Sequence, residues 1–285
     1  ASQLSEDHVQ WTIIDEVADA TGTRQDTEHG RHSDQQPRTS SRLLSSAGRL
    51  LNSQLDRHID ARTLILQRRS AVAFDGISHC SRGAFIDMLA RTLPTSAAER
   101  SAAPWDVAPW PPRIHLVLFV HRVDEVAPGL YVLLRDGAAA ERLRSSCRAG
   151  FAWEQASEKV PLYLLQAGDH RTIAKRLSCD QDIASDGFFS LGMLADFEET
   201  LNAFGPHGYR ELFWECGAIG QLLYLEAEAA GARATGIGCF YDDPVHALLG
   251  LTGHSFQSLY HFTIGMPVED NRLTTNPGYP WEVRL

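Results

Sequence analysis

Three stretches of the chain carry the apolar pattern of a helix. Residues 58–69 and 82–92 place apolar side chains at helical spacing. Residues 209–231 predict a much longer helix that ends at Gly231, where a glycine commonly follows the last helical turn. Residues 188–204 are also rich in apolar residues, but their periodicity does not distinguish a strand from a helix.

Extended structure is predicted where β-branched and aromatic residues form apolar runs. These runs are residues 114–123, 128–136, 160–167, 233–240 and 258–270. The first run is apolar almost throughout and predicts a mostly buried strand, and the second follows after a turn and predicts its hairpin partner. His115 and His121 flank the first run, and we interpret them as residues of a polar face or edge and not as ligands.

The middle of the long helix is built from small residues. Residues 216–220 read Cys-Gly-Ala-Ile-Gly. A glycine within a helix costs about 1 kcal/mol relative to alanine, so Gly217 and Gly220 need a reason, and close approach of another backbone is the usual one. The helix is also too apolar for a surface position. We therefore expect residues 209–231 to lie centrally or at a subunit interface.

The first fifty residues differ in composition from the rest. Residues 8–20 could form a short helix or an extended arm. Residues 21–49 lack aromatic side chains and are rich in Arg, Ser, Asp, Gln and Thr, so they cannot bury enough surface to offset the entropy of ordering. We interpret them as a flexible linker and expect the folded domain to comprise residues 50–285.

Length and charge narrow the class of protein. The chain has 285 residues and a formal net charge of -10. The length fits one large domain or two small ones, and the charge disfavours nucleic-acid binding because phosphate contacts need a basic surface. No apolar run reaches the roughly 18–20 residues of a membrane span, and the polar start of the chain does not resemble a signal peptide. We therefore expect a cytoplasmic protein that binds neither nucleic acid nor a membrane.

The number and spacing of the cysteines predict free thiols and not disulfides. There are five, an odd number, and they lie far apart at Cys80, Cys147, Cys179, Cys216 and Cys239. This spacing argues against a disulfide framework and against a zinc ribbon. We expect buried thiols in a reducing compartment. No His–Asp arrangement that would activate Cys239 as a nucleophile is evident, so we interpret it as a small buried packing residue.

Residues 233–251, RATGIGCFYDDPVHALLGL, offer two interpretations of an acidic pair. Asp242, Asp243 and His246 could bind a metal, but a third strong ligand at helical spacing is missing. The alternative is a helix that Asp243 caps, with Pro244 at its first position. We favour the cap and expect no metal site. A glycine at the end of the preceding strand would then let a flat ligand reach backbone N–H groups.

Four segments, taken in order, resemble the nitroreductase-like FMN-dependent oxidoreductases. They are QRRSAVAFDG (67–76), the glycine-bearing helix ending at residue 231, ATGIGCF (234–240) and YHFTIGMPVEDNRLTT (260–275). The resemblance covers residues 58–285. It is strongest to the branch that dehydrogenates azoline rings to thiazoles and oxazoles, which includes chains with two such domains in tandem.

This resemblance implies an α+β fold with a mixed, largely antiparallel sheet flanked by helices. It also implies that two such domains, as a homodimer or a tandem pseudo-dimer, pack through their long central helices with FMN at the interface. Residues 1–20 look like the connector between tandem domains. The flavin-binding positions that the resemblance implies are Arg68, Arg69, Ser70, Ile237, Gly238, Cys239 and Arg272.

The roles implied for these residues agree with their chemistry. Arginine guanidinium groups, as in Arg68 and Arg272, suit the phosphate of FMN. The backbone around Gly238 would face N5 and O4 of the flavin, since glycine lets a ligand approach closely. No residue is assigned as a catalytic acid or base.

Two departures from the family pattern leave a second function open. Val72 stands where the family usually has a lysine or arginine near the flavin pyrimidine, and the loop 103–113 is altered. The first hypothesis is an FMN-dependent oxidoreductase that acts on azoline rings in modified peptides. The alternative is a flavin-free, non-catalytic domain that scaffolds a catalytic partner domain.

Overall fold

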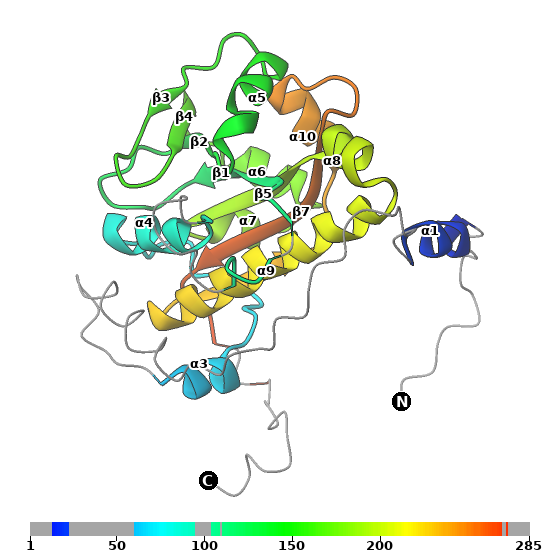
Figure 1. Ribbon diagram of the computed structural model, residues 1–285. Coiled ribbons are helices and arrows are strands. Elements are labelled where there is room, and N and C mark those ends of the chain that lie inside the picture. Colours follow the sequence, from blue (N-terminus) through cyan, green and yellow to red (C-terminus); the bar gives the residue numbers. More distant parts are fainter. Residues whose placement is uncertain (1–12, 23–59, 95–103, 109, 270–271, 273–285) are drawn as a thin grey trace, which may run out of the picture.

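Figure 1 shows the computed structural model of the chain. It describes residues 13–22, 60–94, 104–108, 110–269 and 272. Most of the predicted linker, from residue 23 to residue 49, lies outside the described residues, so the division of the chain into connector, linker and domain stays a prediction. None of the helices in the described part is long and apolar enough to cross a membrane.

One seven-stranded sheet forms the centre of the molecule, with the strand order β3-β4-β2-β1-β5-β7-β6 (Figure 1). Its strands are β1 (Ile114–Val120), β2 (Gly129–Leu133), β3 (Glu154–Gln155), β4 (Leu162–Ala167), β5 (Phe189–Asp196), β6 (Arg233–Ile237) and β7 (Phe256–Gly265). Neighbouring strands all pair antiparallel. The predicted strands and the β1–β2 hairpin are confirmed. Most strands are shorter than predicted, while β7 begins two residues before the predicted run.

Helices cover both faces of the sheet (Figure 1). One face packs against α4 (Arg82–Arg91) and α9 (His207–Ala229). The other packs against α5 (Ala140–Ser146), α6 (Arg171–Leu177) and α10 (Asp242–Leu249). The remaining helices are α1 (Ile13–Gly22), α3 (Ala61–Gln67), α7 (Ile183–Asp186), α8 (Phe197–Phe204) and the 3-10 turn η1 (Gly137–Ala139).

Strand β1 shows why its sequence is apolar throughout. Alternate residues of a strand point to opposite faces. Leu116 and Leu118 belong to the core beneath α4 and α9, whereas Val117 and Phe119 belong to the core beneath α5, α6 and α10. All seven positions of β1 are buried. The ambiguous stretch 188–204 contains both kinds of element, because β5 ends at Asp196 and α8 begins at the next residue.

The long helix predicted at 209–231 is confirmed as α9, and Gly231 follows its C-cap with φ of 79°. Gly220 faces the sheet, where an added Cβ would meet the Phe262 ring at 3.5 Å. A Cβ added at Gly217 would meet nothing within 4 Å in the described chain. The expectation of a second backbone is therefore wrong for Gly220, whose close neighbour is an aromatic side chain, while Gly217 lies on an outer face.

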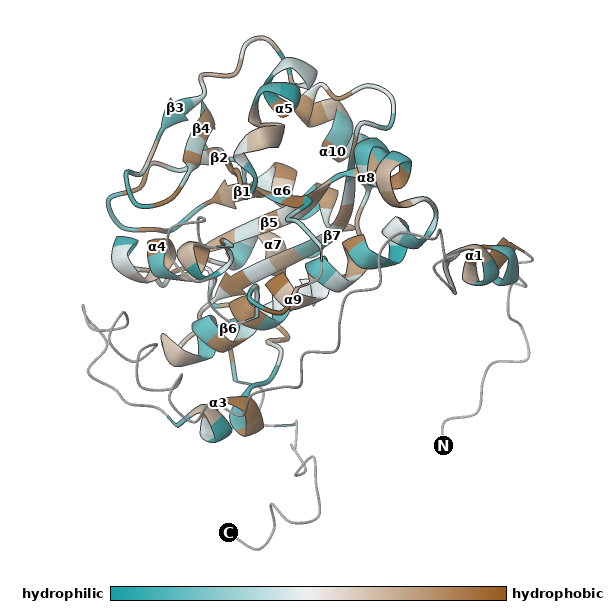
Figure 2. Cartoon of the chain, viewed as in Figure 1, coloured by the Kyte–Doolittle hydropathy of each residue, from teal (hydrophilic) through white to brown (hydrophobic). Residues whose placement is uncertain are grey.

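Helix α1 lies beside the start of α9 (Figure 1), so the alternative of a helix for residues 8–20 is confirmed from Ile13 onward. The Arg210 guanidinium donates to the Thr21 hydroxyl at 3.2 Å. Ile13 and Ile14 of α1 are both exposed. Figure 2 shows brown, apolar ribbon on this helix beside teal, hydrophilic ribbon. Residues 1–12 lie outside the described residues.

The interpretation of His115 and His121 as polar-face or edge residues is wrong, because both are buried. Their side chains lie inside the core with that of His261. Burial lowers the pKa of each of the three to about 4, because the cation loses its hydration; Arg135 lowers the pKa of His115 further. All three are neutral at pH 7.

Because these histidines are held neutral, we expect the free energy of unfolding to fall in acid. Their ordinary pKa of 6.5 applies in the unfolded chain, so below it the unfolded state binds protons that the folded state does not take up until about pH 4. Their contribution to stability is present above pH 6.5 and is lost as the pH falls toward 4. We expect urea unfolding at pH 4.5 to show a loss of about 2 kcal/mol per histidine relative to pH 7.

A glutamine variant separates this effect from that of the carboxylates. The His121 Nε2 atom lies 3.0 Å from the Ala184 carbonyl oxygen, and a glutamine amide could donate the same hydrogen bond. In His121→Gln, the loss of unfolding free energy between pH 7 and pH 4.5 should be smaller than in the wild type by the about 2 kcal/mol expected for one histidine. An unchanged dependence in the variant would mean that His121 is not held neutral by burial.

Candidate functional site

The implied flavin residues other than Arg272 lie at the edge of the sheet formed by β6. Ser70 forms a parallel bridge to Ala234, and the Ala71 N–H donates to the Ala234 carbonyl at 3.1 Å. The Thr235 hydroxyl donates back to the Ala71 carbonyl at 2.7 Å. The segment after α3 therefore lies along β6, and the structure brings Arg68 to Ser70 beside the strand that leads to Gly238.

Tyr224 of α9 joins these segments and was missed by the sequence analysis. Its hydroxyl lies 2.8 Å from the Ser70 hydroxyl and accepts the Gly236 N–H at 2.9 Å. Its ring lies beneath the Arg68 guanidinium, 4.7 Å from the ring centroid, and packs edge-on against Phe262. The one sequence signal is spacing, because Tyr224 follows Gly220 by four residues and so lies on the same helix face.

Arg68 and Arg69 have different surroundings. The Arg69 guanidinium donates to the carbonyls of Leu66 and Arg68, each at 2.7 Å, and so closes the end of α3. Arg68 stacks on Tyr224, and among the described residues no carboxylate pairs with it. A half-buried guanidinium over an aromatic ring, without an acidic partner there, remains able to receive an anion.

The two glycines around Ile237 are explained differently. Ile237 is buried against the short segment after α3 and against α7. A Cβ on Gly236 would lie 2.6 Å from the Tyr260 hydroxyl, so packing requires this glycine. Gly238 is exposed, has an ordinary φ, and an added Cβ would meet only the Tyr260 ring at 3.9 Å. Neither packing nor backbone conformation in the described chain requires a glycine at position 238.

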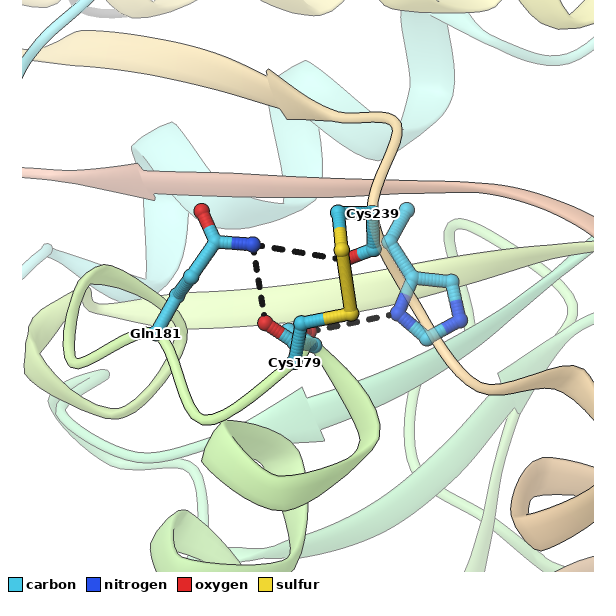
Figure 3. Close-up of a disulfide and its surroundings, with 5 residues drawn as sticks. Cys179, Gln181 and Cys239 are labelled. Atoms are coloured by element: carbon cyan, nitrogen blue, oxygen red, sulfur yellow. Dashed lines mark hydrogen bonds between the residues drawn. A yellow bond between two sulfur atoms is a disulfide. The ribbon is translucent and has the colours of Figure 1, made fainter. Parts of the chain in front are cut away.

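Cys239 is neither buried nor a free thiol, so two expectations drawn from the cysteines are wrong. It forms a disulfide with Cys179, with the Cα atoms 5.9 Å apart (Figure 3). Cys239 is exposed and Cys179 half-buried. The two are 60 residues apart in sequence, but the end of α6 meets the turn after β6, where the Tyr241 N–H donates to the Leu177 carbonyl at 2.9 Å.

The acidic pair lies in the first turn of α10, as the structural interpretation predicted, but Asp243 is not the cap. The N-cap is Tyr241, and α10 begins at Asp242. The Asp242 carboxylate accepts the Gln257 side-chain amide at 2.9 Å. His246 Nε2 accepts the backbone N–H of Ser258 at 3.1 Å, so both side chains hold α10 against β7.

The positions that depart from the family pattern are also visible. Val72 is 68% exposed beside the candidate site. In the altered loop, Trp105 stacks on the Arg135 guanidinium and donates from its ring N–H to the Arg91 carbonyl at 3.1 Å. Residues 103 and 109 of this loop lie outside the described residues. Arg272 is exposed, and its position relative to the other site residues stays a prediction.

Two clefts lie away from this edge. One of about 740 Å³ is lined by α4, Glu125 and residues 155–159. Another, of about 440 Å³, lies between α6 and α7 and is lined mainly by charged side chains, including Arg122, Arg171 and Asp186. Neither is lined by the implied flavin residues. Within the described part of the chain, the candidate residues line neither cleft and lie along an open edge of the sheet.

The fold is that of the nitroreductases, and residues 129–266 match the family model of the nitroreductase family. This region runs from β2 to the end of β7 and includes α9, Gly238 and the disulfide. The chain is 33% identical over 55 residues to a Methanocaldococcus jannaschii protein provisionally assigned as a nitroreductase. The aligned stretch covers 19% of this chain and 28% of that protein.

Solved structures show the same fold at low sequence identity. A provisionally assigned nitroreductase from Anabaena variabilis superposes with a TM-score of 0.54 at 20% identity, over 73% of this chain and 38% of that chain. A chain of the E. coli microcin synthetase McbBCD complex, with truncated pro-MccB17 bound, superposes with a TM-score of 0.51 at 17% identity. This superposition covers 81% of this chain and 84% of the synthetase chain. The chain spans well under half the length of the Methanocaldococcus and Anabaena proteins.

Proposed function

We propose that the chain is an FMN-dependent oxidoreductase of the nitroreductase family. The observation that carries this proposal is Gly238, an exposed glycine that the described chain does not require, at the end of an edge strand. A ligand that must approach the backbone explains it. The family match over residues 129–266 supports the same conclusion.

The proposal assigns each residue a distinct task. Arg68 and Arg272 would hold the phosphate, and Ser70 and Arg69 would support the segment that carries Arg68. The backbone from Ile237 to Cys239 would face the flavin N5 edge. Bound FMN supplies a hydride acceptor and donor at N5, which allows two half-reactions. The described residues fit this role at Arg68 and Gly238, which are open to a ligand.

The finer proposal for the substrate is an azoline ring in a modified peptide, which this enzyme would dehydrogenate. It is supported by the sequence resemblance and by the fold shared with a chain of the microcin synthetase complex, whose structure contains a truncated peptide precursor. The open edge at β6 would admit a ring carried by a long chain more readily than an enclosed pocket would. We also propose that the protein is cytoplasmic, on the grounds of its sequence.

A flavin-free domain that scaffolds a catalytic partner domain is the second candidate. Its supporting observation is that Val72, where the family usually places a cation, is 68% exposed and offers no charge. The Ser70 hydroxyl and the Arg69 guanidinium already have partners within the chain. The altered loop contributes packing around Trp105.

Arg68→Ala tests the assignment of the phosphate. A charge-assisted hydrogen bond contributes about 1.5–3 kcal/mol, so we expect the Kd of FMN to rise at least about tenfold. Riboflavin, which lacks the phosphate, should bind the variant as it binds the wild type. Arg62 is exposed on the same helix α3 and serves as the matched control. Equal weakening of FMN and riboflavin would contradict the assignment.

The partner proposal is a second nitroreductase-like domain, in a homodimer or a tandem pseudo-dimer, packed on the outer face of α9. This face exposes Tyr209, Phe213 and Trp214 and includes Gly217. Large exposed aromatic side chains beside a glycine are typical of an interface.

Gly217→Leu should break this assembly without unfolding the domain, because Gly217 is exposed and a Cβ added there meets nothing within 4 Å. We expect light scattering after size exclusion to show a smaller species with an unchanged thermal transition. Gly83→Leu is the control, since Gly83 lies in helix α4, where an added Cβ also has open space. An unchanged species for Gly217→Leu would contradict the proposed interface.

A further inference from the structure

We propose that Cys179 and Cys239 form a thiol–disulfide exchange site that locks the turn carrying Gly238 when oxidised and releases it when reduced. The disulfide connects the turn after β6 to the loop between α6 and α7 (Figure 3). The inference rests on these two loops and not on flavin binding.

The turn has few other ties to the body of the protein. Strand β6 ends at Ile237, so the residues that follow have left the sheet ladder. The Gln181 side-chain amide donates to the Cys239 carbonyl at 3.3 Å, and the Tyr241 N–H donates to the Leu177 carbonyl (Figure 3 shows the first). The Phe240 ring stacks on His261 at 4.4 Å. Among the described residues, these two hydrogen bonds and one ring contact tie the turn to the body of the protein without depending on the disulfide.

The loop on the other side is held in an unfavourable backbone conformation. Cys179 and Asp180 both have a left-handed backbone, with φ of 54° and 56°. Side chains with a Cβ rarely adopt this region, because the Cβ crowds the backbone. The disulfide is one of the ties that hold this loop, because it joins Cys179 to the turn after β6. Exposed disulfides, or those that hold strained segments, are the labile and regulatory ones.

The other three cysteines do not compete for this chemistry. Burial raises the pKa of the Cys80 and Cys147 thiols to about 11 and raises that of Cys216 further. A thiol with a raised pKa is a poor nucleophile and exchanges slowly.

The reductant is a dithiol, either a small molecule or a dithiol protein. Its thiolate attacks the exposed Cys239 sulfur, forms a mixed disulfide and displaces the Cys179 thiolate, which takes up a proton. The second thiol of the reductant then attacks its own sulfur in the mixed disulfide and releases the Cys239 thiolate, which is also protonated. Two electrons and two protons reach the protein, and the dithiol becomes a disulfide.

Alkylation of the full-length protein tests the exchange. The oxidised protein is treated with increasing dithiothreitol without denaturant, then with iodoacetamide, and the labelled cysteines are identified by peptide mass spectrometry. We expect Cys179 and Cys239 to be unlabelled at first and to become labelled together, while Cys80 and Cys216 stay unlabelled and circular dichroism is unchanged. Labelling of the pair without reductant, or only when the protein unfolds, would overturn the proposal.

Hydrogen exchange tests the release of the turn. We expect amides of residues 238–241 to exchange at least fivefold faster in the reduced protein, with those of β1 and β5 unchanged. Cys239→Ser should reproduce the reduced state, and Cys147→Ser is the control that should not. Where Cys239→Ser fails to fold, the reduced wild type gives the same comparison. Equal exchange in the two redox states would overturn the proposal. Neither readout involves flavin, so a protein that binds no FMN but shows both results would refute only the proposed function.

Discussion

Glu215→Ala is expected to destabilise the fold by about 3–5 kcal/mol, because it leaves the Arg135 guanidinium charged and buried without its partner. Both side chains are at most 1% exposed and form an ion pair. Glu215 also accepts the backbone N–H of Arg113 at 3.0 Å, and Arg135 donates to the Thr92 carbonyl at 2.6 Å. The pair therefore ties α9 to β1 and to the end of α4.

Urea unfolding measures this effect, and a more exposed ion pair between α4 and α9 provides the control. Arg91 and Glu226 pair at 3.0 Å, with side chains 40% and 21% exposed. Glu226→Ala should cost no more than about 1 kcal/mol, since solvent screens such pairs. Similar losses for Glu215→Ala and Glu226→Ala would mean that the buried pair does not have the structural role assigned to it.

Gly238→Val is expected to abolish FMN uptake while the protein remains folded. An added Cβ at Gly238 meets only the Tyr260 ring, at 3.9 Å, and the backbone there is ordinary. The side chain would instead cover the backbone N–H that the proposal directs at the flavin N5 edge. We expect the Kd of FMN to rise more than about a hundredfold, equivalent to about 2.8 kcal/mol, in a fluorescence titration.

Two other glycines make this test specific. Gly150 is exposed, has an ordinary φ, and an added Cβ there has open space, so Gly150→Val should leave both folding and FMN binding unchanged. Gly236→Val should lower the unfolding midpoint, because its Cβ would lie 2.6 Å from the Tyr260 hydroxyl. Normal FMN binding by Gly238→Val would show that the sequence Gly-Ile-Gly forms only a tight turn.

The sequence predicts β1 and α9 well because both are long or strongly apolar, whereas it does not predict the short elements β3, α5, α6 and α7. Strand β1 is buried on both faces and carries a continuous apolar run, and α9 runs without interruption to its C-cap. The stretch 188–204 could not be assigned because it holds the end of a strand and the start of a helix. The predicted cap at Asp243 was two residues late, since α10 begins at Asp242 and Pro244 lies within its first turn.

The candidate site was harder to predict because tertiary contacts define it. Nothing local to Cys179 indicates Cys239, which reaches it only because the end of α6 packs on the turn after β6. Tyr224 is one of several apolar residues in its helix, and its contacts with Ser70 and Arg68 depend on how α9 crosses the sheet edge. The sequence also gives no means to distinguish the role of Gly236 from that of Gly238, because the difference lies in how closely each packs against Tyr260.

The central claim is that the domain binds FMN at the β6 edge, and the visible absorbance spectrum tests it most directly. The purified full-length protein is incubated with excess FMN and desalted, and its spectrum is compared with those of Arg68→Ala and Gly238→Val treated in the same way. We expect flavin bands that persist in the wild type and are lost or strongly reduced in both variants. A colourless wild-type protein that fails to retain added FMN would contradict the claim and would favour the flavin-free scaffold.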